Sequence, residues 1–249
     1  MSKPSSFNDP FDCRPTINYD DDPFNINHHS DIPALKAVYE KYDASKSLLI
    51  DDEIKVAIMA WCNKESSNEL VSQLIQNKIQ NFGVKCFFRS GFDNPVMWAH
   101  YAENHKGFCV EYEYDWKRSL KVGNDDKFLL SPVTYTSGIS AVDLMQVLIK
   151  PDLALKQLLT CKASEWSYEQ ETRLIYFPMC KKKAGECVDL PSSLNVSAIY
   201  SGIAAESIGN DLQEAAQTLG VELYQMKMTE FGLDADPTQD SKGSEIGVY

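Results

Sequence analysis

The chain has 249 residues, of which 43% are hydrophobic and 11% aromatic. These fractions supply enough apolar surface for a folded core, which excludes wholesale disorder, collagen and coiled-coil rods. The formal net charge is −12 at pH 7. Such a charge argues against a broad nucleic-acid-binding surface and leaves room only for a local basic patch.

The sequence also predicts where the protein works. No stretch approaches the roughly 20 uncharged apolar residues that a bilayer helix needs, and the amino terminus lacks the apolar core of a signal peptide. We therefore expect a cytoplasmic protein without a membrane partner. The seven cysteines form no C-x-x-C pair, which predicts reduced thiols and no metal site.

Apolar spacing and turn residues predict the elements in the first half of the chain. After an Asn-, Asp- and Pro-rich loop, helical spacing runs from about residue 31 to Gly83. The dipeptide Asn94-Pro95 predicts a helix from about Val96 to Lys106. Strands are predicted at residues 84–90 and 108–114, the second half-buried.

The second half continues the mixture. Strands are predicted at residues 128–136, 173–177, 196–200 and 221–228, and helices at 141–163, broken at Pro151, and at 205–219. The predicted fold class is α+β, a single mixed domain over residues 1–233 with a central, mostly antiparallel sheet and a helical insertion at about 31–83. Residues 234–249 are expected to form a mobile polar tail.

The predicted helix at 96–106 carries an aromatic group with two histidines. On a helix Trp98, Tyr101 and His105 share one face, and His100 lies on another. The two histidines diverge by about 140° and so cannot jointly hold a metal ion as an i,i+4 pair can. One interpretation is an aromatic helix packed on a sheet. A site role stays open for His100 and Tyr101.

A second group contains two acids close together. If the chain is extended here, Glu169, Glu171 and Arg173 form one row on one face. Paired carboxylates raise the proton affinity of one member unless a cation such as Arg173 compensates, and perturbed carboxylates are candidates for catalysis. The alternative is an exposed ladder that pairs with lysines on the next strand and adds little stability.

Other segments are less informative. Asn8 and Asp9 belong to a turn held by bonds from side chains to backbone amides. Residues 181–183 are three lysines, typical of a solvated loop. The fingerprints of P-loop, dinucleotide-binding and common serine-hydrolase proteins are absent from the sequence.

Three motifs together resemble a bacterial family, the domain of unknown function family 2971. They are Phe7-Asn8-Asp9-Pro10-Phe11-Asp12, Met97 to Ala102 with His105 to Phe108, and Lys162 with Trp166, Glu169, Glu171 and Arg173-Leu174. The resemblance covers roughly residues 5–230. It implies an accessory role in bacterial defence or a toxin, and carries no activity by itself.

The chain also has a distant similarity to ADP-ribosyltransferases, which implies NAD as the molecule consumed. Glu171, or Glu169, then matches the late glutamate that stabilises the positive charge as nicotinamide leaves. Trp98 or Tyr101 then stacks on nicotinamide or walls the pocket. Such relatives are expected to carry a strand with an aromatic–basic pair before the Asn-Asp-Pro segment, whereas this chain begins almost directly at Ser6.

Three hypotheses follow. The first is a transferase or NAD glycohydrolase in which Glu171 stabilises charge, Glu169 orients the acceptor and Arg173 tunes both. Substrate-binding residues in this hypothesis are His100, Tyr101, Trp98, Trp166, Asn8 and Asp9. The second is a metal-dependent nuclease that uses Glu169, Glu171 and Lys162. The third is a non-enzymatic protein-binding module. Protein and nucleic-acid targets both stay open.

Overall fold

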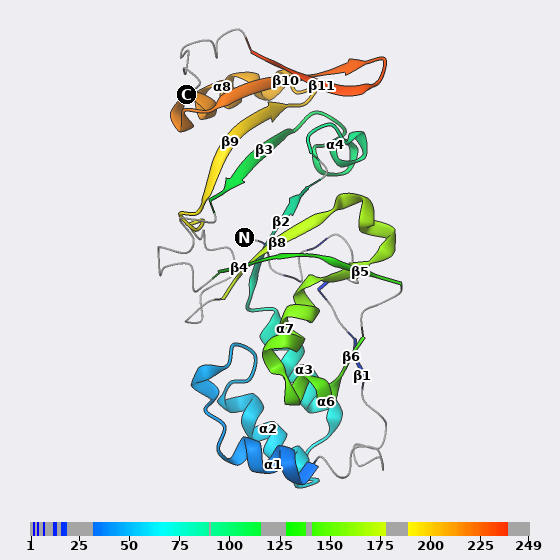
Figure 1. The fold of residues 1–249 in the computed structure, drawn as a ribbon, viewed down its shortest axis with the longest axis vertical. Helices are drawn as coiled ribbons and strands as arrows, with labels where there is room; N and C mark the ends of the chain where they lie inside the picture. The colour runs from blue at the N-terminus through cyan, green and yellow to red at the C-terminus, as the bar shows by residue number, and fades with distance from the viewer. Residues whose placement is uncertain are drawn as a thin grey trace. The chain divides into compact units, whose positions relative to one another are not determined.

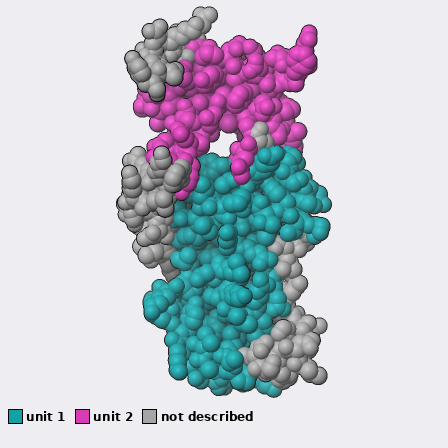
Figure 2. Space-filling model, in the orientation of Figure 1, with its two compact units in different colours: residues 1–87, 127–188 teal, residues 88–126, 189–249 magenta. Residues whose placement is uncertain are grey.

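The computed structural model describes residues 2, 4, 7, 12–13, 16–18, 32–89, 91–115, 128–137, 141–177 and 189–238 (Figure 1). The chain divides into two compact units (Figure 2). Unit 1 comprises residues 1–87 and 127–188, and unit 2 comprises residues 88–126 and 189–249. The prediction of one domain over residues 1–233 stays a prediction.

The helical region of unit 1 lies where the sequence predicts it. Its helices are α1 (Ile32–Glu40), α2 (Asp52–Cys62) and α3 (Asn68–Ile79). Asp51 and Ser67 begin the second and third, because their side chains accept bonds from backbone N–H groups in the first turn. Helix α3 ends at Ile79, so Gly83 is not its stop and instead opens strand β2 (Gly83–Phe88).

The predicted break at Pro151 is present in unit 1. Helix α6 (Leu144–Ile149) stops just before it, and α7 (Pro151–Thr160) begins with it, because proline fits the first helical position but not a helix interior. The ends of the predicted helix are strands instead, β6 (Ala141–Asp143) and β7 (Cys161–Ala163). The core between the helices contains Tyr39, whose hydroxyl donates to the carbonyl of Leu148 at 2.8 Å.

Strand β8 (Glu171–Tyr176) is the middle strand of a three-stranded sheet in unit 1, with β2 on one side and β4 (Phe128–Pro132) on the other. β4 and β8 are antiparallel. The strand predicted over 128–136 is interrupted at Val133 and resumes as β5 (Thr134–Thr136), which pairs in parallel with β7. The short strand β1 (Thr16–Asn18) pairs in parallel with β6.

Unit 2 is built on a four-stranded sheet. Its order is β11 (Gly232–Pro237), β10 (Glu222–Thr229), β9 (Leu194–Ser201) and β3 (Phe108–Tyr114). The outer pairs are antiparallel, and β9 and β10 are parallel. Helix α8 (Gly209–Leu219) connects these two parallel strands and buries Leu212 and Ala216 against Ile199 and Leu223. Residues 234–237, predicted as tail, belong to β11, and 239–249 lie outside the described residues.

Helix α4 (Pro95–Tyr101) is shorter than the predicted 96–106. Glu103, Asn104 and His105 have positive φ angles of 49°, 56° and 68°, so the backbone leaves the helix one turn early. The turn is held because the N–H of His105 donates to the carbonyl of Trp98 at 3.2 Å. The glycine at 107 donates to the carbonyl at 102 at 2.8 Å, in the manner of a helix-ending turn.

These elements confirm the α+β class. Among the described residues the strands are spread over several sheets, and the two larger ones contain antiparallel pairs. Within the same residues no helix is both long and apolar enough to cross a bilayer.

Candidate functional site

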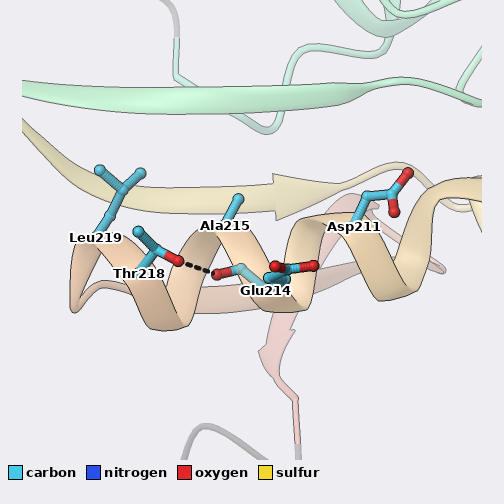
Figure 3. A pocket seen from close by; sticks show the side chains of 5 residues that line it. All are labelled: Asp211, Glu214, Ala215, Thr218 and Leu219. Atoms are coloured by element: carbon cyan, nitrogen blue, oxygen red, sulfur yellow. Dashed lines mark hydrogen bonds between the residues drawn. The ribbon is translucent and has the colours of Figure 1, made fainter.

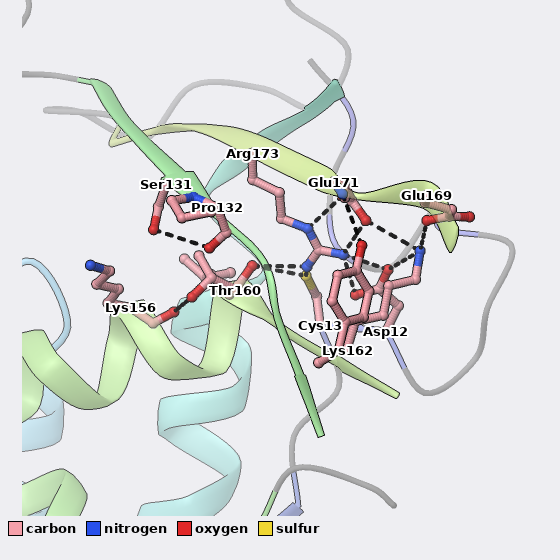
Figure 4. A network of polar contacts seen from close by, with 12 residues as sticks. Asp12, Cys13, Ser131, Pro132, Lys156, Thr160, Lys162, Glu169, Glu171 and Arg173 are labelled. Carbon is pink, nitrogen blue, oxygen red and sulfur yellow. Dashed lines mark hydrogen bonds and ion pairs between the residues drawn. The ribbon is translucent and has the colours of Figure 1, made fainter. Parts of the chain in front are cut away.

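Glu171 and Arg173 lie on the same side of β8, as a period of two predicts, and both are buried. Arg173 Nε donates to Glu171 Oε1 at 2.7 Å, and Arg173 Nη2 donates to Oε2 at 3.2 Å. Figure 4 shows the guanidinium facing the carboxylate. This fork-to-carboxylate geometry gives a strong, charge-assisted pair.

Glu169 reaches the same cluster by a different route from the one predicted. It is the last residue of the 3-10 helix η4 (Ser164–Glu169), and Gln170 turns the chain with a φ of 46° before β8 begins. The prediction of one extended row through Glu169 is therefore wrong, because the left-handed residue interrupts the strand period. The carboxylate of Glu169 is nevertheless fully buried beside the others.

Lys162 on β7 joins the two acids. Its Nζ donates to Glu169 Oε2 at 2.6 Å and to Glu171 Oε2 at 3.2 Å. The same atom lies 3.5 Å from Asp12 Oδ2 and 4.8 Å from the ring centre of Trp166. The half-buried Trp166 therefore covers the ammonium group with an aromatic face, a favourable cation–π contact.

Arg173 also binds the amino-terminal part of unit 1. Its Nη2 donates to Asp12 Oδ1 at 2.8 Å and Oδ2 at 2.7 Å. Its Nη1 donates to the carbonyl of Leu159 at 2.8 Å and to Cys13 Sγ at 3.0 Å. The ring of Phe7 lies 5.5 Å from the guanidinium carbon. One buried guanidinium thus connects β8, the end of α7 and the amino-terminal segment.

We call Asp12, Lys162, Glu169, Glu171 and Arg173 the charged network. Their side chains are between 0% and 5% exposed. The interpretation as an exposed surface ladder is therefore wrong, since the strand carrying two of these residues is the central one of its sheet. Three carboxylates face two cations, so the network carries a formal charge of −1 when all five groups are ionised.

The surroundings shift the pKa values of Glu171 and Lys162 toward their ionised forms. Burial raises the pKa of Glu171, but the hydrogen bond and charge of Arg173 outweigh it, so the net shift of that pKa is downward. Burial lowers the pKa of Lys162, yet its bond to Glu169 and the nearby acids raise that pKa overall. Arg173 is thus the cation that offsets the repulsion between the paired carboxylates, a role that the sequence left open.

The aromatic group belongs to unit 2, whereas the charged network belongs to unit 1. Trp98 is buried, and its indole N–H donates to the carbonyl of Phe92 at 2.6 Å. The ring of His105 stacks on Trp98 at 6.4 Å although α4 has already ended. Tyr101 is 41% exposed and lies 5.0 Å from the ring of Phe88.

Other predicted residues divide into exposed, half-buried and undescribed positions. His100 is exposed, and its ring lies 6.3 Å from that of Tyr101. Asn8 and Asp9 lie outside the described residues. Sequence reasoning assigned no site role to Asp12 or Cys13, although both stand at the end of the Asn-Asp-Pro motif and could have been suspected from that position.

An open hollow lies on helix α8 of unit 2, within the described part of the chain. It has a volume of about 370 Å³ and is lined by Asp211, Glu214, Ala215, Thr218 and Leu219 (Figure 3). All of these side chains come from a single helix. Within the described part of the chain, no cluster of three or more His, Cys, Asp or Glu side chains is arranged to hold a metal ion.

The segment from α4 to β8 carries two of the three predicted family motifs, and the motif from Phe7 to Asp12 lies before it. Residues 97–174 match the family described as protein of unknown function (DUF2971). The match confirms the predicted family over this segment, which is shorter than the expected range of about 5–230. The DUF2971 segment includes Lys162, Glu169, Glu171 and Arg173, whereas Asp12 precedes it. No curated protein and no solved structure matches the chain significantly.

Proposed function

We propose that the protein is an NAD-consuming enzyme of the ADP-ribosyltransferase or NAD glycohydrolase type, with Glu171 as the charge-stabilising carboxylate. The observation that carries the proposal is the state of Glu171, an ionised carboxylate whose two oxygens are held by Arg173 and Lys162. Positive charge develops on the ribose as its bond to nicotinamide breaks. A carboxylate already fixed in position stabilises that charge without reorganising.

The network's charge supports this role. The two cations beside Glu171 offset part of its field, but the third carboxylate leaves the network with a formal excess of one negative charge. In a buried setting such an excess acts over several ångströms, because little water screens it. We expect the developing cation to bind on the side of the network nearest Glu171.

The remaining predicted residues take supporting roles in this proposal. Glu169 orients the acceptor, and Arg173 fixes the carboxylate of Glu171. The half-buried ring of Trp166 offers an aromatic face next to the network. Trp98, His100, Tyr101, Asn8 and Asp9 complete the proposed substrate-binding set, and the biological setting implied by the family resemblance is bacterial defence or a toxin.

Substrate access requires movement in unit 1. The side chain of Glu171 is 1% exposed, and the hydroxyl of Tyr135 accepts a bond from the backbone N–H of Glu171 at 2.8 Å. A substrate can therefore touch Glu171 only after neighbouring side chains have moved. We expect turnover to be limited by this opening rather than by the bond-breaking step.

The test is release of nicotinamide from NAD, followed by proton NMR. The wild-type protein should release nicotinamide, and Glu171→Gln should abolish the release while circular dichroism shows a folded chain. Glu165→Gln is the matched control, because Glu165 lies in the 3-10 helix that precedes β8 and is exposed. Equal turnover by wild type and Glu171→Gln, or no release by the wild type, contradicts the proposal.

The metal-dependent nuclease receives less support from this geometry. The ammonium group of Lys162 lies between the carboxylates of Glu169 and Glu171, at 2.6 and 3.2 Å from their oxygens. A divalent ion bound by these two acids would have to displace it at a cost in charge repulsion. Titration of Mg²⁺ in a nucleic-acid cleavage assay tests this alternative directly.

A second candidate, the protein-binding module, is favoured by the hairpin of β10 and β11. Phe231 is 98% exposed and Met228 is 78% exposed, although the turn itself is ordered. The hydroxyl of Thr229 donates to the carbonyl of Gly232 and accepts from the N–H of Phe231. Large apolar side chains displayed on an ordered turn are typical anchors for a protein partner. Binding that survives Glu171→Gln but is lost in Phe231→Ser would support this candidate.

A further inference from the structure

The amino-terminal segment places a carboxylate where a ligand's anionic group could bind. Asp12 lies 161 positions from Arg173 in the sequence, yet both of its oxygens accept bonds from Arg173 Nη2, at 2.8 and 2.7 Å. The same carboxylate lies 3.5 Å from Lys162 Nζ. Two cations thus converge on one oxyanion group, the arrangement with which proteins bind carboxylates and phosphates.

The formal charge of the network changes when the carboxylate of Asp12 is withdrawn from it. The remaining four groups, two cations and two carboxylates, sum to zero. A single negative charge in the place of Asp12 returns the sum to −1, the formal charge of the closed network. An apolar group would leave the freed donors of Arg173 buried without acceptors, which is unfavourable.

The two cations and Asp12 also come from different parts of the sequence. Lys162 and Arg173 lie inside the DUF2971 segment, whereas Asp12 lies before it. The contacts that fix Asp12 in this place converge on one guanidinium, since Phe7 stacks near its carbon and Cys13 accepts from its Nη1. Withdrawal of Asp12 would thus remove one carboxylate partner from both cations, which keep their contacts with Glu171.

We propose that Arg173 and Lys162 form a binding site for a phosphate group of the substrate, and that Asp12 occupies this site as an internal competitor. The inference rests on the proposed function, because NAD carries two phosphate groups with one negative charge each. Glu171 contacts the same two cations. Phosphate binding here therefore places the rest of the substrate beside the charge-stabilising carboxylate.

The experiment measures binding of ADP-ribose by isothermal titration calorimetry. ADP-ribose keeps both phosphates but has no nicotinamide to lose. We expect Asp12→Ala to bind it at least tenfold more tightly than the wild type, because the competing carboxylate is gone. The matched control is Asp152→Ala, an exposed aspartate of α7 in the same unit, whose affinity should equal that of the wild type.

Sodium acetate is the second arm of this titration. It tests whether the vacated position accepts any small oxyanion. Tighter binding of ADP-ribose than of acetate by Asp12→Ala supports a phosphate site. Binding of acetate alone, or unchanged ADP-ribose affinity in a folded Asp12→Ala variant, overturns the inference.

Hydrogen exchange on the wild-type protein keeps the inference testable if Asp12→Ala does not fold. Saturating ADP-ribose should speed amide exchange in the peptide that carries Asp12 and Cys13 several-fold, while the peptide that carries β8 stays protected. Unchanged exchange in the first peptide overturns the inference. ADP-ribose binding with no nicotinamide release would uphold this site and reject the proposed enzyme, so the two failures are distinguishable.

Discussion

The side chains of Glu171 and Arg173 pair with each other from alternate positions of one strand. Arg173 Nε lies 2.7 Å from Glu171 Oε1, and both side chains are almost completely enclosed. Neighbouring side chains on one face of a strand lie close enough for this, and the long arginine folds back along the strand to reach the acid. Lys162 contacts Glu171 and Asp12 contacts Arg173, so the pair connects three separate segments of unit 1.

Removal of the guanidinium should be among the most destabilising changes in unit 1. Arg173→Met leaves the carboxylates of Asp12 and Glu171 buried without their main partner. We expect a loss of about 3–5 kcal/mol in the free energy of unfolding, measured by urea denaturation. Arg89→Met, at an exposed position, should change it by less than about 0.5 kcal/mol. A similar small effect at Arg173 would show that the network adds no stability.

The sequence predicts part of this network and misses the rest for physical reasons. The period of a strand is enough to place Glu171 and Arg173 on one side. It cannot foresee that Gln170 adopts a left-handed conformation and that Glu169 ends a 3-10 helix. The pairing of Asp12 with Arg173 depends on a contact across most of the chain, which no local pattern encodes.

The same distinction holds for the fold. The break at Pro151 is predictable because the proline ring forbids a helix interior. The early end of α4 is not, since it depends on three successive non-glycine residues with positive φ, beginning at Glu103. Their cost is offset by tertiary bonds, such as the one from the N–H of Ala204 to the carbonyl of His105 at 3.0 Å.

The bond between Lys162 and Glu169 should couple the two residues energetically. We expect Lys162→Met and Glu169→Gln each to destabilise the protein, and the double variant to lose less than the sum of the two. A double-mutant cycle by urea denaturation should give a coupling energy of about 1–3 kcal/mol. Additive effects would mean that the 2.6 Å contact contributes nothing beyond the two separate environments.

Acid should lower the free energy of unfolding through protonation of Glu171. Its pKa in the folded protein lies below the ordinary value of 4.5, so ionisation stabilises the fold. This contribution is complete above pH 4.5 and is lost as the pH falls through the lowered pKa. The difference in unfolding free energy between wild type and Glu171→Gln should therefore shrink below pH 4.5. Urea denaturation between pH 7 and pH 3 measures it, with Glu165→Gln as the exposed control. A difference that grows in acid would contradict the assigned direction.

Glycine at position 202 should be indispensable to unit 2. A Cβ atom there would lie 2.2 Å from the carbonyl oxygen of His105 and 2.8 Å from that of Gly107. Both oxygens belong to backbone that accepts hydrogen bonds from the segment around Gly202, so neither can move without breaking a bond. We expect Gly202→Ala to lower the free energy of unfolding by about 1–3 kcal/mol or more.

The matched control for this change is Gly209→Ala. Position 209 opens α8, and a Cβ there meets nothing within 4 Å. Alanine at this site should leave stability unchanged or raise it by up to about 1 kcal/mol, because it restricts the unfolded chain and favours the helix. Thermal and urea denaturation should therefore show a loss of stability for Gly202→Ala and none for Gly209→Ala. Equal effects would show that the close approach of 202 to the turn after α4 does not constrain the fold.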